Sequence, residues 1–156
     1  MRPITSQDFE LRGCSKWVAP DGSVYLELPK YFIFSVLVPA GSTLPTQQQP
    51  ASPSYEFLLD VVSVFQPLTT PAQSDIYGRF QWPNGHFSAQ QLEDLTQFYG
   101  LGQWGRLQEP PVSCPPGSII RMQLQNPGGA DSRITIHFEG RLRIPLVPCG
   151  YVKPCN

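Results

Sequence analysis

The acidic residues Glu56 and Asp60 have the spacing that best suits acid–base chemistry in this chain. They stand four residues apart in a segment expected to be a strand, so their side chains point to the same face. Glycoside hydrolysis uses two such carboxylates across the scissile bond. On a mostly apolar strand, however, acids are more often solvated edge residues or partners for arginine. We therefore assign no catalytic residue and expect a non-enzymatic protein.

The cysteines and histidines lack the spacing of a metal site. The four cysteines are Cys14, Cys114, Cys149 and Cys155. They form no C-x-x-C pair, and both histidines lie far from them in sequence, so we expect no metal and no cofactor. The thiols are expected to be free and buried, and a disulfide between the last two cysteines is left open. His137 has no nucleophile or metal ligand nominated beside it, and we expect it at the surface or in an interface.

Two further motifs resemble binding sites in their spacing or composition. Residues 100–105 have the spacing G-x-G-x-x-G, but the phosphate-binding version follows a strand and opens a helix. Here a helix is expected before the motif and two prolines follow it, so a nucleotide site is rejected. The aromatic-rich stretch that includes Trp82 and Trp104 is open to two interpretations. It could form a sugar-binding platform, but core packing or interface anchoring is the plainer interpretation.

The composition is low in charge and rich in proline. Charged residues make up 15% of the 156 residues, against about 25% in an ordinary globular domain, which suits a surface covered by partners. The net charge of −1 gives no sign of a nucleic-acid-binding surface or a polybasic membrane anchor. No apolar run approaches the ~20 residues that span a membrane, and the first residues do not resemble a signal peptide. The 18 prolines fall mainly between hydrophobic runs, as in strands joined by rigid loops.

The clearest element is a strand over residues 133–144, where polar and apolar residues alternate without a break. Gly140 occupies one apolar position and predicts a bulge or bend, because it has no side chain to pack. Residues 117–125 alternate in the same way, and the connection between the two segments is rich in turn-forming residues. The sequence therefore predicts that these two strands form an antiparallel hairpin.

Residues 31–38 are apolar on both faces, and residues 55–65 are nearly so, interrupted by Glu56, Asp60 and Ser63. A strand of this kind must be covered on both sides. One cover is the opposite sheet, and the other must be a helix, a loop or another subunit. Because the chain offers little helix, a partner subunit is a candidate for the second cover.

The remaining elements complete the expected fold. Further strands are expected over residues 9–17, 23–28 and 77–82, and a helix over 88–100 that Ser88 caps with Gln91 as its capping-box partner. Residues 39–54 read as an exposed proline-rich loop or arm, and residues 146–156 as an extended tail. The whole chain, residues 1–156, is predicted to be one all-β domain, an antiparallel β-sandwich of jelly-roll-like form with one short helix.

The closing part of the chain resembles small structural proteins of tailed-bacteriophage virions. The resemblance is carried by residues 114–146, CPPGSIIRMQLQNPGGADSRITIHFEGRLRIPL, with the strand-like segment 76–88, IYGRFQWPNGHFS. It spans roughly residues 31–146 and is one of pattern. Proteins of that type are jelly-roll-like sandwiches that decorate or cement the capsid shell. The expected helix over residues 88–100 and the cysteine-bearing tail depart from that pattern.

The resemblance implies a partner and a place. The partner would be the major capsid protein, contacted by dimers or trimers of this chain, and the place would be the capsid surface of a virion assembled in the host cytoplasm. Alternatives are another virion component (neck, tail or baseplate) and a carbohydrate-binding sandwich module. The residues expected at the interface are Tyr31, Ile33, Leu37, Trp82, Trp104, Arg133, His137, Arg141 and Arg143. The arginines are expected to form salt bridges with an acidic neighbouring subunit.

Overall fold

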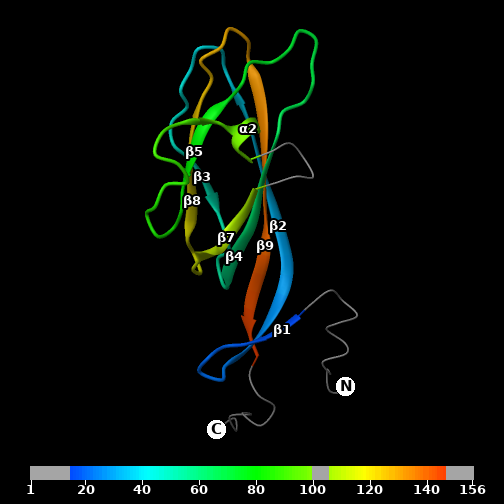
Figure 1. Ribbon diagram of the computed structural model, residues 1–156, viewed down its shortest axis with the longest axis vertical. Helices are drawn as coiled ribbons and strands as arrows, with labels where there is room; N and C mark the ends of the chain where they lie inside the picture. The colour runs from blue at the N-terminus through cyan, green and yellow to red at the C-terminus, as the bar shows by residue number, and fades with distance from the viewer. Residues whose placement is uncertain (1–14, 100–105, 147–156) are drawn as a thin grey trace, which may run out of the picture.

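The computed structural model describes residues 15–99 and 106–146, which form two antiparallel sheets packed face to face (Figure 1). The first sheet has the order β1 (Ser15–Val18), β2 (Val24–Val38), β9 (Ser132–Pro145), β4 (Glu56–Phe65), β7 (Arg106–Cys114). The second has the order β3 (Gln47–Pro50), β8 (Ile119–Gln125), β5 (Tyr77–Gln81), β6 (Glu93–Asp94). The expected all-β antiparallel sandwich is confirmed, with one short helix in the described residues, α2 (Leu95–Tyr99).

The centre of the first sheet is a pair of long strands, β2 and β9. They are paired without a register shift from Tyr25 opposite Pro145 to Val38 opposite Ser132. Figure 1 shows both strands running on beyond the second sheet, with β1 at that end. The strands expected over residues 23–28 and 31–38 are therefore one continuous strand, which passes through an exposed Pro29.

Strand β9 has the alternation expected of it. Ile134, Ile136 and Phe138 are buried in the core, while the polar residues between them face outward. The bulge expected at Gly140 is present on the neighbouring strand. Leu59 lies opposite Gly140 and Val61 opposite Glu139, so Asp60 is the extra residue in β4.

The predicted hairpin of residues 117–125 with 133–144 is wrong, because β8 and β9 lie in different sheets. Their connection crosses the sandwich and is held by Asn126, which is fully buried. The Asn126 Nδ2 group donates to the carbonyl oxygens of Val38 (3.0 Å) and Ala130 (2.8 Å), and its Oδ1 accepts from the Gly128 N–H. These bonds tie the connection to the end of β2, so the chain leaves β8 toward the first sheet.

The two sheets meet in one apolar core. Side chains of β9 and β4 pack from one side against those of β5 and β8, and α2 adds Leu95 and Tyr99. The ring of Phe80 on β5 meets that of Phe138 on β9 edge-on, with centroids 5.7 Å apart. Aromatic pairs of this geometry stabilise a core beyond their buried area.

Three other expectations need correction. Residues 39–54 are not a free arm, because Gln47–Pro50 pairs with β8, and Ala51 and Ser52 are buried. The helix is much shorter than expected, and Asp94, rather than Ser88, caps it by accepting the N–H groups of Thr96 and Gln97. Strand β7 was not expected at all. Residues 1–14 and 147–156 lie outside the described residues, so only β1 remains of the strand expected over 9–17, and the expected tail is not described beyond Leu146.

Candidate protein-docking surface

Large apolar side chains are exposed on the outer face of the first sheet. On β2, Tyr31, Ile33 and Leu37 are 66%, 50% and 45% exposed. On the other side of β9, Phe65 of β4 and Leu107 of β7 are 47% and 56% exposed. We call these five side chains the outer apolar surface. The β2 residues of this surface were expected from the sequence. Phe65 was not, although it ends a largely apolar run, and Leu107 was not because β7 was not expected.

Strand β9 places a polar ridge between the two apolar columns. The strand pairing puts Tyr31, Glu139 and Val61 in one row and Ile33, His137 and Ser63 in the next. The row after that joins Ser35, Thr135 and Phe65, and Arg133 lies beside Leu37. Paired residues in a sheet share a face, so apolar and polar groups alternate across this surface. Protein interfaces combine these two kinds of contact.

An ion-pair network borders this surface, and it corrects the expectation for two arginines. Arg141 makes a bidentate contact with Asp60, at 2.8 and 2.9 Å, and also donates to Glu27 at 2.8 Å. Arg143 donates to the second oxygen of Glu27 at 3.0 Å and lies over the ring of Trp17. The hydrogen bonds that Arg141 donates to Asp60 raise the pKa of Arg141 above its ordinary value. Both guanidinium groups therefore have acidic partners within the chain.

Glu56 and Asp60 both have hydrogen-bond partners on neighbouring strands. Asp60 is held by Arg141, and Glu56 accepts a hydrogen bond from the Ser113 hydroxyl at 2.9 Å. Asp60 is thus the arginine partner that the plainer interpretation predicted. The remaining basic residue of the series, Arg133, is exposed.

For Trp82 the structure supports core packing, one of the plainer interpretations, and corrects its expected place at an interface. Its side chain is 7% exposed and stacks on Phe80 in the core, with ring centroids 5.5 Å apart. A buried ring cannot present its face to a sugar or to a partner protein. Trp104 and the glycine motif of residues 100–105 lie outside the described residues.

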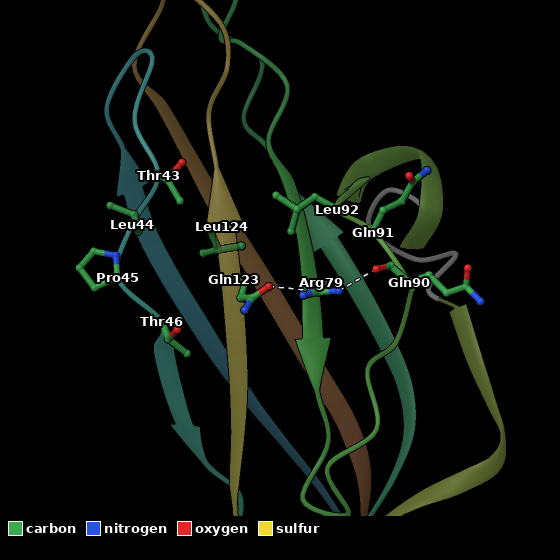
Figure 2. A pocket seen from close by; sticks show the side chains of 10 residues that line it. All are labelled: Thr43, Leu44, Pro45, Thr46, Arg79, Gln90, Gln91, Leu92, Gln123 and Leu124. Carbon is green, nitrogen blue, oxygen red and sulfur yellow. Dashed lines mark hydrogen bonds between the residues drawn. The ribbon is translucent and has the colours of Figure 1, made fainter.

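A groove of about 610 Å³, lined by both polar and apolar side chains, lies over the second sheet. Figure 2 shows Arg79 at its centre, donating to Gln123 Oε1 and to the Gln90 carbonyl, both at 2.7 Å. Arg79 also lies over the ring of Phe87, 4.1 Å from its centroid. The other lining residues are Thr43, Leu44, Pro45, Thr46, Gln91, Leu92 and Leu124. None of the lining residues is a carboxylate, histidine or cysteine, so the groove offers no acid–base pair.

The described residues contain one thiol, that of Cys114, which is fully buried. Burial, and then the nearby charge of Glu56, raise the pKa of this thiol to about 12. A thiol of this kind is protonated at neutral pH and is not a nucleophile. No group of three or more histidine, cysteine, aspartate or glutamate side chains in the described part of the chain could hold a metal ion.

Comparison of the chain with protein-family models and with curated proteins gives no match. Within residues 15–99 and 106–146, no helix has the length and apolar character needed to cross a membrane.

Proposed function

We propose that this protein is a non-enzymatic structural subunit that docks on another protein through the outer apolar surface. The observation that carries the proposal is the exposure of Tyr31, Ile33 and Leu37 along one strand. Exposed apolar groups gathered on one face mark interaction sites more often than chance exposure does. The polar ridge of β9 beside them supplies hydrogen-bonding groups, which give such a surface its orientation.

The partner we propose is the major capsid protein of a tailed-bacteriophage shell, with this chain as a cement or decoration subunit at the capsid surface. This part of the proposal is supported by the resemblance of residues 114–146, and by a composition low in charge. The resemblance is weakened by the separation of β8 and β9 into two sheets. A cement subunit binds the assembled shell in preference to its free parts, and so stabilises the shell by mass action.

The test is a binding experiment on assembled shells that lack this protein. The added protein should sediment with the shells and saturate at a fixed ratio to the capsid protein. Phe65→Lys should weaken binding about tenfold or more, because burial of a large apolar side chain contributes roughly 1.5–3 kcal/mol. Leu68→Lys is the matched control, since Leu68 is fully exposed in the loop after β4 and lies outside the strand.

Two results would contradict the proposal. One is failure of the folded protein to sediment with shells, or its binding to tails or baseplates instead. The other is an equal loss of binding in the two lysine variants, which would show that the outer apolar surface has no special part in the contact.

A further inference from the structure

Strand β2 has an edge that its neighbours leave largely unpaired. β1 pairs with β2 only over Val24–Glu27, at the end of the sheet seen in Figure 1. From residue 28 to residue 38, no described residue pairs with this edge. Exposed edges are usually blunted by charge, proline or a bulge, because they template pairing with another chain. Residues 31–38 contain no charge and no proline.

The direction of the backbone groups on this edge follows from two hydrogen bonds. The Leu146 N–H donates to the Val24 carbonyl on the β9 side, and the Ala19 N–H donates to the Ser23 carbonyl on the β1 side. Backbone groups alternate between the two sides of an antiparallel strand. The odd-numbered residues of β2 therefore direct their N–H and C=O groups toward the open edge. These residues are Tyr31, Ile33, Ser35 and Leu37.

Proline bounds this set of donors on both sides. Pro29 and Pro39 are also odd-numbered, and neither has an N–H group to offer. The two prolines lie at equal distances along the chain from Phe34. The open edge is thus symmetric about Phe34 in its pattern of available hydrogen-bond donors.

We propose that two copies of this chain pair through this edge, antiparallel, about a two-fold axis at Phe34. In this register Tyr31 lies opposite the second copy's Leu37, and Ile33 opposite the second copy's Ser35. Each opposed pair exchanges both of its N–H···O=C bonds. Pro29 then faces the second copy's Pro39, so the two residues that lack an N–H group lie opposite each other. Shifting the register by two residues would place a proline opposite a residue whose carbonyl oxygen would then have no N–H group to accept from.

The charges of β9 complement one another in the same register. Glu139 lies beside Tyr31 and Arg133 beside Leu37 on the outer face. Both are exposed, and neither forms an ion pair within the described part of the chain. Pairing Tyr31 with the second copy's Leu37 places the acidic end of one ridge toward the basic end of the other, on both sides of the axis. A two-fold interface of this kind is self-complementary.

The pairing would join the two first sheets into one continuous sheet with both outer apolar surfaces on the same side. It would also cover Phe32, Phe34 and Val36, which are only partly buried against the core. The inference goes beyond the docking function proposed above and does not depend on it, because the edge can pair whether or not the outer face binds a shell.

The experiment is sedimentation equilibrium of the full chain and of three variants. The unmodified protein should sediment as a dimer that dissociates on dilution. Ser35→Pro removes an outward N–H and leaves the backbone hydrogen bonds to β9 in place, and it also removes the hydrogen bond that the Ser35 hydroxyl accepts from Thr135 of β9 at 3.2 Å. By symmetry it deletes two hydrogen bonds, and it should raise the dimer dissociation constant by a factor of ~10 to ~100. Ile33→Lys places a charge in the pairing and should also favour the monomer. Leu107→Lys, an equally exposed side chain on the opposite edge of the sheet, should remain dimeric.

Several outcomes would overturn the pairing. A monomeric unmodified protein would do so, and so would a dimer that survives in folded Ser35→Pro and Ile33→Lys. If Ser35→Pro fails to fold, the comparison of Ile33→Lys with Leu107→Lys shows whether the dimer forms through the edge of β2. Amide hydrogen exchange at Ile33 and Ser35 tests for another occupant of the edge, since protection of these amides in a monomer would mean that another segment of the same chain covers the edge, and it would overturn the pairing. Dimers that do not bind shells would count against the docking function and leave the pairing intact.

Discussion

Glu27 shows how a single buried charge organises the end of the first sheet. Its carboxylate is almost fully buried, and its two oxygens accept hydrogen bonds from Arg141 and Arg143. A buried charge is tolerated when its partners satisfy it, and loss of one partner leaves an uncompensated ion. The arginines were expected to pair with a neighbouring subunit, because their acidic partner lies 114 and 116 residues away in sequence. No spacing rule reaches that far, so only the strand pairing reveals the contact.

At the same scale, the buried Cys114 thiol gives a prediction for stability at alkaline pH. Its pKa is raised from 9.0 to about 12 in the folded protein. Below pH 9 the thiol keeps its proton in both the folded and the unfolded protein, and its contribution to the free energy of unfolding is fully present. From pH 9 to about 12 the unfolded chain loses the proton while the folded protein retains it, so the free energy of unfolding falls as pH rises. The slope from this group approaches about 1.4 kcal/mol per pH unit.

The measurement is urea unfolding of the unmodified protein and of Cys114→Ala from pH 8 to 11. Tyrosines, lysines and the other cysteines titrate in both proteins, so their effects cancel in the difference. The alanine variant should be less stable at pH 8, and its deficit should shrink as pH rises. A deficit that stays constant with pH would refute the contribution of the thiol.

At the scale of elements, the bulge in β4 explains why position 140 is glycine. A β-carbon there would overlap the carbonyl oxygen of Leu58 and come within 2.8 Å of Phe57 Cζ. Gly140→Ala should therefore destabilise the protein by about 1–3 kcal/mol, the usual cost of overpacking. The matched control is Gly129→Ala, because a β-carbon at Gly129 meets no atom within 4 Å and the change should stay within ~0.5 kcal/mol. Chemical denaturation measures both, and similar values for the two variants would contradict the steric explanation.

The strands differ in how well the sequence predicts them. Residues 133–144 alternate cleanly, and both the element and its outward face were predicted correctly. β7 was missed because Pro110 and Pro111 argue against a strand. The pairing with β4 changes register there, which lets an edge strand accept them. The partner of β9 was mispredicted for another reason. The turn-rich connection suggested a hairpin, whereas the hydrogen bond from Asn126 to Val38, 88 residues away in sequence, directs the chain into the other sheet.

Part of the outer apolar surface could be predicted from the sequence. A run that is apolar on both faces, such as residues 31–38, must expose one face or cover it, so Tyr31, Ile33 and Leu37 could be named from sequence. Whether a lone aromatic such as Trp82 faces inward depends on its sheet and register, and this information is not local. Phe65 and Leu107 join the surface only through the pairing of four strands.

At the scale of the whole molecule, the chain passes repeatedly from one sheet to the other and the two sheets share one apolar core, so we expect them to unfold together. Phe80 and Phe138 come from different sheets and are both fully buried. Each alanine substitution should cost about 3–5 kcal/mol. Because the rings touch edge-on, the double variant should show a coupling energy of about 0.5–1.5 kcal/mol. Urea unfolding followed by both circular dichroism and tryptophan fluorescence should give coincident single transitions. Additive losses would contradict the coupling of the two rings, and transitions that differ between the two probes would mean that the sheets unfold independently.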